Sequence, residues 1–267
     1  MSGMRRGLVA AGLLLTALLV GVAGLVTING MASQTVREEH SYAFAGKTLA
    51  VDTAIGDVHI VPGKDGQVTV ARRLTYGLRR PFVEERIDGD VFRVSDHACT
   101  ADIAFDCRVR WLLQVPRDVD VEVTSESGSI NVSGMSSTVK LVSDSGSVRV
   151  LAPSGKLVTL RSRRGDVTAQ NVSSEQVVAT SVSGAVSLVF REPPSLVVGR
   201  SETGKVGVVL PDGDESYRIE AKSTEDGSRT VTAKDDPDSR RRINVRSGKG
   251  DVSVLQNPDR ERDPAAG

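Results

Sequence analysis

One repeated pattern limits the folds open to this chain more than any other feature. The pattern reads apolar-x-apolar/small-x-Ser/Thr-x-x-Gly-x-Val/Ile-x-apolar. Its copies are LAVDTAIGDVHI at 49–60, VEVTSESGSINV at 121–132, VKLVSDSGSVRV at 139–150, VTLRSRRGDVTA at 158–169, VVATSVSGAVSL at 177–188, VVGRSETGKVGV at 197–208 and INVRSGKGDVSV at 243–254. From Gly128 to Gly204 the shared glycines are 18, 19, 19 and 20 residues apart. Such a regular short period is typical of a fold in which one small unit is stacked on the next.

Each copy consists of two alternating runs that meet at the glycine. Val139, Leu141 and Ser143 share one face of the first run, and Val148 and Val150 share one face of the second. The pattern therefore predicts two strands joined at a corner where backbones approach closely or φ is positive. The predicted corners are Gly56, Gly128, Gly146, Gly165, Gly184, Gly204 and Gly250. The hydroxyl column before them, predicted to be a structural ladder, is Thr53, Ser125, Ser143, Ser162, Ser181, Ser201 and Ser247.

The fold class expected from this pattern is all-β, because no long amphipathic helical stretch follows residue 30. Identity of columns between successive copies favours a repeat-built β-solenoid, of the parallel β-helix type, after one N-terminal transmembrane helix. The alternative is an antiparallel β-sandwich of hairpins. A degenerate copy around Ile219 to Val231, with Gly227, is expected to fill the gap before the last copy, and Gly89 marks another weak copy. The irregular stretch 66–117 is expected to form a cap or a side layer, with Trp111 in the core.

The N-terminal segment predicts the compartment of the rest. Arg5 and Arg6 precede an uncharged stretch from Gly7 to Ile28, whose length of roughly 33 Å is enough to cross a bilayer core of about 30 Å. The arginines place residues 1–6 in the cytoplasm and the remainder outside. The expected division is a span at 7–28 anchoring the chain in the cell membrane, a linker at 29–46, an extracytoplasmic β-repeat domain at 47–256 and a disordered tail at 257–267. The alternative is a cleaved signal peptide and secretion.

Two cysteines fit an exported domain. In an oxidising compartment Cys99 and Cys107 are expected to form a disulfide that closes a small loop. A metal site with His97 is the alternative, but no fourth ligand stands at a recognisable spacing.

The layout resembles the bacterial DUF4097 family of candidate adhesins, which are built from β-strand repeats. The matching features are the membrane segment, the LAVDTAIGDVHI opening, a strand ending in Val115-Pro116 and the serial S-x-x-G-[SD]-[VI] copies, over about residues 40 to 256. The resemblance implies an exported, surface-associated β-repeat domain whose ligand is generally undefined, and it carries no catalytic residues over to this chain.

Charge and residue types exclude several functions. Lys+Arg and Asp+Glu both number 34, so the chain lacks the basic surplus of a nucleic-acid binder. The column serines have no partnered histidines. Asp57, Asp90, Asp166 and Asp251 follow glycines and are candidates for calcium or paired-acid chemistry, but Gly-Asp is ordinary turn chemistry. We therefore predict no enzyme and no catalytic, cofactor-binding or metal site.

A partner surface is the remaining functional prediction. Val178, Val182 and Val198 fall on the outward parity of consecutive copies, beside Arg161, Arg163, Arg164 and Arg200. Residues 66–117 could instead cover the valines. The function predicted is non-enzymatic adhesion or cell-envelope scaffolding, with a cell-wall polymer or a membrane protein as partner. The alternative is an accessory regulator of envelope-stress signalling that acts through a membrane partner.

Overall fold

In the computed structural model, residues 19–21, 34–77, 80–97, 107–225 and 227–256 are described, and apart from a helical turn at 19–21 they form an all-β fold. The strands are β1 (Gln34–Ala43), β2 (Thr48–Ile55), β3 (Val58–Pro62), β4 (Gln67–Tyr76), β5 (Phe82–Asp88), β6 (Val91–His97), β7 (Arg108–Val115), β8 (Asp120–Ser127), β9 (Ile130–Ser133), β10 (Val139–Ser145), β11 (Val148–Leu151), β12 (Leu157–Ser162), β13 (Val167–Val172), β14 (Gln176–Ser181), β15 (Val186–Phe190), β16 (Leu196–Ser201), β17 (Val206–Leu210), β18 (Arg218–Ser223), β19 (Arg229–Val231), β20 (Arg242–Ser247) and β21 (Val252–Gln256).

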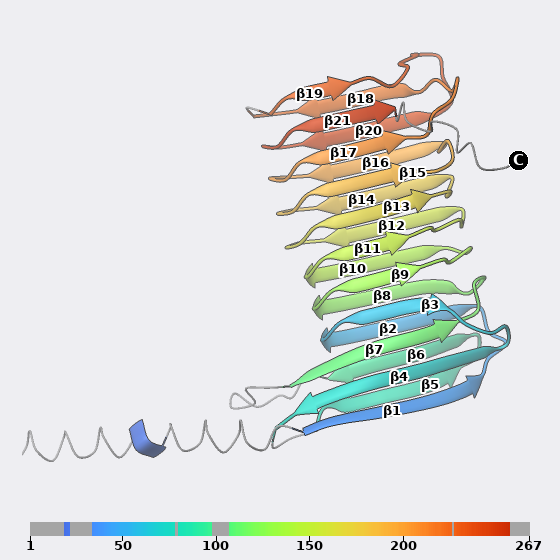
Figure 1. The fold of residues 1–267 in the computed structure, drawn as a ribbon, viewed down its shortest axis with the longest axis vertical. Helices are drawn as coiled ribbons and strands as arrows, with labels where there is room; N and C mark the ends of the chain where they lie inside the picture. Colours follow the sequence, from blue (N-terminus) through green and yellow to red (C-terminus); the bar gives the residue numbers. More distant parts are fainter. Residues whose placement is uncertain (1–18, 22–33, 78–79, 98–106, 226, 257–267) are drawn as a thin grey trace, which may run out of the picture.

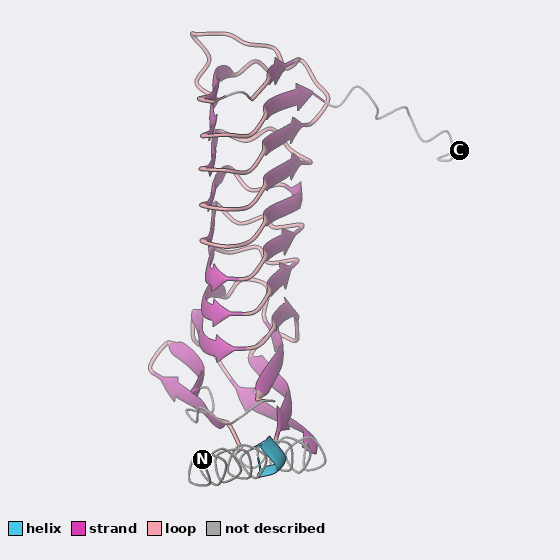
Figure 2. Cartoon of the chain, turned by 90° about the vertical axis from the view of Figure 1, so that its left-hand side faces the viewer, coloured by secondary structure: helices cyan, strands magenta, loops and turns pink. Residues whose placement is uncertain are grey.

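These strands make two long sheets that face each other. One sheet, here called sheet A, has the order β1-β4-β7-β3-β9-β11-β13-β15-β17-β21-β19. The other, sheet B, has the order β18-β20-β16-β14-β12-β10-β8-β2-β6-β5. Each repeat copy gives its first strand to sheet B and its second to sheet A, so that one copy is one coil. Figure 1 shows the coils in a column, and Figure 2 shows the two sheets as separate walls joined by short loops.

Successive coils stack in register with like residues side by side. In sheet B, Leu141 lies between Val123 and Leu160, and all three strands run parallel. In sheet A, Val150 lies between Val132 and Ala169 in the same way. The solenoid-like arrangement is therefore confirmed, and the antiparallel sandwich of hairpins is wrong for these coils.

The core lies between the sheets and follows from the alternation in each strand. Val139, Val158, Val177 and Val197 form one inward column in sheet B, and each is fully buried. β-Branched side chains suit such a pleated, packed surface. Burial of each valine stabilises the fold by about 2 kcal/mol relative to exposure. Because every coil repeats the same inward columns, the core is continuous along the stack.

At the N-terminal end the chain passes beyond its first coil and then returns. The coil β6–β7 lies outside β2–β3, since β6 pairs with β2 and β7 pairs with β3. Beyond it, β4 and β1 extend sheet A and β5 extends sheet B, all in antiparallel pairs. The described strands of residues 66–117, β4 to β7, thus form the end of the stack rather than a side layer. Trp111 is fully buried, which confirms its predicted place in the core.

Two details of the N-terminal prediction are wrong. Residues 34–43 were expected to be linker, but they form β1, whose ten residues pair along β4. Gly89 is not a corner of a coil: it lies with φ 58° in the turn between the antiparallel strands β5 and β6. The local IDGDVFRV pattern belongs to a hairpin turn, which favours the same glycine.

The C-terminal end reverses chain order too. The degenerate copy at 219–231 supplies β18 and β19, which are the last strands of their sheets. The regular copy at 243–254, which follows it in the sequence, supplies β20 and β21. These two strands insert between β16–β17 and β18–β19. The prediction that the degenerate copy fills the gap before the last one is therefore wrong in space. The regular copy pairs on both sides, and the irregular one closes the end.

Parts of the sequence predictions fall outside the described residues. The predicted span 7–28 is described only at 19–21, which is helical, and Cys99 and the tail 257–267 are not described. Within the described ranges no helix has the length and apolar character needed to span a bilayer. The membrane anchor and the Cys99–Cys107 disulfide stay predictions.

Candidate binding face

The corner glycines lie where the backbones of successive coils come closest. A Cβ at Gly165 would overlap the carbonyl oxygen of Gly146, and one at Gly184 would overlap that of Gly165. The same obstruction by the coil before it holds at Gly128, Gly146, Gly204 and Gly250, and at Gly56 the obstructing oxygen belongs to Val109. Of the seven corner glycines, only Gly56 (φ 151°) and Gly128 (φ 135°) have a positive φ. Close approach, rather than backbone conformation, is thus the common reason for glycine.

The serine column explains the spacing Ser-x-x-Gly. Ser201 Oγ accepts a hydrogen bond from Gly204 N (2.8 Å) in its own corner and donates one to the Gly184 carbonyl of the preceding coil (2.8 Å). Ser247 makes the same pair of bonds with Gly250 N (2.7 Å) and the Gly204 carbonyl (2.8 Å). One small hydroxyl therefore fastens both the corner and the contact between coils. These buried serines are structural, as their lack of a base partner suggested.

The outer coil β6–β7 carries Asp96 at the position of the column serine. Asp96 lies beside Thr53, is 6% exposed, and accepts hydrogen bonds from Thr53 Oγ1 (2.6 Å), Ala54 N (3.0 Å) and Trp111 Nε1 (2.8 Å). All three donors are thus satisfied by one buried carboxylate. The repeat pattern missed Asp96, although its place five residues after Val91 matches that of Thr53 after Thr48.

A cluster of polar side chains lies beyond Asp96 at the N-terminal end of the stack. Glu85, whose side chain is 4% exposed, pairs with Arg72 and accepts a hydrogen bond from Tyr42 Oη (2.7 Å). Arg72 also pairs with Glu38 (2.6 Å), and His40 Nδ1 lies 3.6 Å from Glu85. Burial, together with the bond to Glu85, raises the pKa of Tyr42 to about 12. The N-terminal end of the stack is thus covered by polar side chains that are paired with one another.

The carboxylates after the corner glycines bond to backbone, not to one another. Asp57 Oδ1 accepts from Ser129 N (3.1 Å), and Asp166 Oδ1 accepts from Ala185 N (2.8 Å). Asp251 Oδ1 accepts from Ser228 N (3.0 Å); this bond and Lys205, 3.1 Å away, lower the pKa of Asp251 to about 2. Asp90 lies in the β5–β6 turn. Within the described part of the chain, no three His, Cys, Asp or Glu side chains gather as a metal site would require.

The outer face of sheet B carries a line of exposed cations. The residue just before each column serine points outward, and parallel register aligns these residues across strands. On β12, β14, β16, β20 and β18 they are Arg161, Thr180, Arg200, Arg246 and Lys222, here called the basic row. The four cations are exposed. Among the described residues, no carboxylate is within ion-pair distance of any of them.

The four arginines of the predicted partner surface fall into two pairs. Arg163 and Arg164 both turn to Asp144 of the preceding coil, and the bond from Arg163 holds the pKa of Asp144 below its usual range. Arg161 and Arg200 belong to the basic row. Arg246 and Lys222 were missed because the last two coils do not follow chain order; the dipeptides Arg-Ser and Lys-Ser before the corners were the available signal.

The three predicted valines lie on the same outer face. Val178 and Val198 are neighbours in register and lie two residues before the basic row on their strands, and both are half-buried. Val182 is 40% exposed near the corner of its coil. Strands β4 to β7, the described strands of residues 66–117, lie at the N-terminal end of the stack and do not cover these valines (Figure 1).

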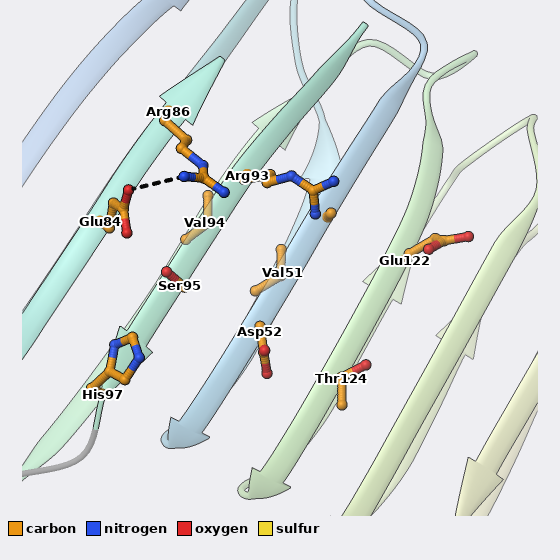
Figure 3. Close-up of a pocket in the computed structure, with 11 residues that line it drawn as sticks. Val51, Asp52, Glu84, Arg86, Arg93, Val94, Ser95, His97, Glu122 and Thr124 are labelled. Atoms are coloured by element: carbon orange, nitrogen blue, oxygen red, sulfur yellow. Dashed lines mark ion pairs between the residues drawn. The ribbon is translucent and has the colours of Figure 1, made fainter. Parts of the chain in front are cut away.

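The N-terminal half of the same face is different. A shallow groove of about 370 Å³ crosses β2, β5, β6 and β8 (Figure 3). Its charges are mixed and partly paired, since Arg86 lies 3.6 Å from Glu84 and Arg93 lies 3.8 Å from Asp88. Here the continuation of the basic row reads Val142, Thr124, Asp52 and Ser95 along β10, β8, β2 and β6. The cations of the basic row are therefore confined to the C-terminal half of this face.

Comparison with solved structures gives distant likenesses. One is a candidate cell adhesion protein from Clostridium sporogenes (9% identity, TM-score 0.43, covering 84% of this chain and 100% of that one). Another is a candidate adhesin from Bacteroides fragilis (12% identity, TM-score 0.48, 83% and 97%). A third is a candidate adhesin from Parabacteroides merdae (10% identity, TM-score 0.43, 82% and 96%). No curated protein matches the chain.

The family comparison covers the whole coil stack. The model of the Toastrack DUF4097 family matches residues 43–257, from the end of β1 to just past β21. This range includes every corner glycine and every column serine described above. The chain therefore belongs to the Toastrack DUF4097 family.

Proposed function

We propose that this protein is a non-enzymatic adhesion or scaffolding protein of the cell envelope. Residues 7–28 would hold it in the membrane as a single-pass anchor, with the coil stack outside. The single observation that carries the proposal is the basic row, an exposed line of cations without carboxylate partners on a broad, uncovered face. Such a line attracts anionic partners and raises their local concentration.

The residues that could suggest catalysis have structural partners. The column serines are buried, and four of them, Ser162, Ser181, Ser201 and Ser247, donate to corner carbonyls. Asp57, Asp166 and Asp251 bond to the backbone of neighbouring coils. Their positions support a binding role for the stack over a hydrolytic one. The strands lie side by side along the whole stack, which gives it long faces suited to an extended partner (Figure 1).

A cosedimentation experiment tests this proposal. The full-length chain, purified in mild detergent, is mixed with isolated bacterial cell walls, and the bound fraction is measured at increasing salt. We expect binding that weakens as salt rises and that Arg161→Ala/Arg200→Ala/Arg246→Ala abolishes. The matched control Arg149→Ala removes an exposed arginine from the outer face of sheet A and should leave binding intact.

Two outcomes would contradict the proposal. Equal binding by the triple variant would show that the basic row is not the contact surface. If cell walls do not bind, and crosslinking in cells captures one membrane protein through the same face, the accessory-regulator function replaces adhesion.

A further inference from the structure

We propose that the basic row holds a linear acidic polysaccharide with one carboxylate on each sugar, lying along the stack axis and across the strands. This inference rests on the proposed function and names the ligand class of the same face. It follows from three properties of the row: its charge, its spacing and its apolar neighbours.

The charge of the row requires an anionic ligand. Arg161, Arg200 and Arg246 present guanidinium groups, and Lys222 adds an ammonium group at the end coil. Glu220, the nearby carboxylate on β18, accepts a hydrogen bond from Asn244 (2.8 Å) on the adjacent strand. The forked guanidinium matches a carboxylate with two parallel hydrogen bonds, which favours a ligand rich in carboxylates.

The spacing of the row favours a polymer that carries its charges at short, regular intervals. Strands in a sheet are about 4.8 Å apart, so the five strands of the row span roughly 19 Å. An extended chain of uronic acid sugars places one carboxylate per ring at a comparable interval. Phosphates in a polyol-phosphate chain are separated by a longer linker. Nucleic acids would gain from aromatic side chains for base stacking, and β12, β14, β16, β18 and β20 contain none.

The neighbouring column provides a surface for the sugar rings. Val178 and Val198 lie beside the row, half-buried, with Thr159 continuing their column on β12. Their methyl groups can pack against the C–H faces of pyranose rings while the arginines bind the carboxylates. The row has one gap, at Thr180, between Arg161 and Arg200.

That gap gives a test that does not depend on loss of function. Filling it with Thr180→Arg should raise the affinity for an oligogalacturonate of eight sugars about fivefold at low salt, measured by isothermal titration calorimetry on the full-length chain. The matched control Thr168→Arg adds the same charge to the outer face of sheet A and should change the affinity less than twofold. Arg200→Ala should lower it at least fivefold.

Ligand length gives a second readout. Affinity should rise with oligogalacturonate length and level off at about five sugars, when the five strands of the row are filled. A plateau at two sugars, or equal gains from Thr180→Arg and Thr168→Arg, would overturn the inference.

Other occupants are separated by the same experiments. Binding to cell walls through the row with no affinity for oligogalacturonate would overturn this inference and leave the proposed function standing. Tighter binding of a polyol-phosphate polymer would also overturn it. So would sedimentation of the protein as a dimer that Arg200→Ala dissociates, because a second copy would then cover the row.

Discussion

The central coils and the N-terminal end build the same two-sheet stack by different means. Between β8 and β17, each coil contacts a near copy of itself, so glycine fits every corner, and the hydroxyls of Ser162, Ser181 and Ser201 bond to the corner carbonyl of the preceding coil. At the N-terminal end, β7 and β6 have antiparallel neighbours, β4 and β5, on their outer sides, and Asp96 accepts three hydrogen bonds at the position of the column serine. Repetition thus lets the central coils share the same glycine and serine positions, whereas the N-terminal end has a charged side chain at the equivalent position.

The largest effect is expected from a corner glycine. Gly165→Ala should destabilise the protein by about 4 kcal/mol, because the new methyl group overlaps the Gly146 carbonyl and two coils must separate. The matched control is Gly207→Ala on the outer face of β17, where a Cβ meets only Ser253 Oγ at 3.4 Å. Urea denaturation of both variants measures the difference, and equal midpoints would contradict the close-approach account.

Removing the special carboxylate of the N-terminal end should have a somewhat smaller effect. Asp96→Ala leaves Thr53 Oγ1, Ala54 N and Trp111 Nε1 without their acceptor, which should cost about 3 kcal/mol. Because Trp111 is the only tryptophan, its fluorescence reports the same site directly. Asp52→Ala, which removes an exposed carboxylate on β2, is the control and should leave stability and emission nearly unchanged.

Within the central coils, two serines of one column should differ. Ser181 Oγ donates to the Gly165 carbonyl at 2.9 Å, whereas Ser143 Oγ is buried without a hydrogen-bond partner. Ser181→Ala should therefore cost about 1 kcal/mol, and Ser143→Ala should be neutral or slightly stabilising. Thermal unfolding of the two variants gives the comparison, and a larger loss at Ser143 would show that the column acts through packing alone.

The smallest effect concerns the polar cluster beyond Asp96. With its pKa raised to about 12, Tyr42 stays protonated in the folded protein while an unfolded tyrosine ionises near its ordinary pKa of about 10. The stabilisation is therefore full below pH 10 and is lost as pH rises through about 12. Ultraviolet difference titration against Tyr42→Phe should show this late ionisation. A difference spectrum that titrates near pH 10 would place Tyr42 in solvent.

The repeat predicted the central coils because each of their features is local. Strand, corner and inward column can all be read within one copy, and like columns such as Leu141 and Leu160 then stack. The ends could not be predicted in this way. That β20 inserts before β18, or that β1 pairs with β4, depends on contacts between segments whose patterns do not differ from those of ordinary strands.

The candidate site, too, was predicted only in the regular copies. Arg161 and Arg200 were predicted together because both lie in regular copies of the repeat, with one copy between them. Arg246 and Lys222 join them only through the reversed order of the last two coils. Arg163 was assigned to the surface by proximity in sequence, but its carboxylate partner Asp144 lies one coil earlier.

The most direct test of this account asks whether β20 lies between β16 and β18, since both the stacking rule and the basic row depend on it. Arg200→Cys is combined with either Arg246→Cys or Lys222→Cys, and the yield of a short bifunctional thiol crosslinker is measured by peptide mass spectrometry. Adjacent strands lie about 4.8 Å apart and next-nearest strands about twice that distance. The account predicts an efficient crosslink between positions 200 and 246 and little between 200 and 222. An efficient crosslink between 200 and 222 with little between 200 and 246 would contradict this order of the coils. Arg246 would then not lie between Arg200 and Lys222 in the basic row.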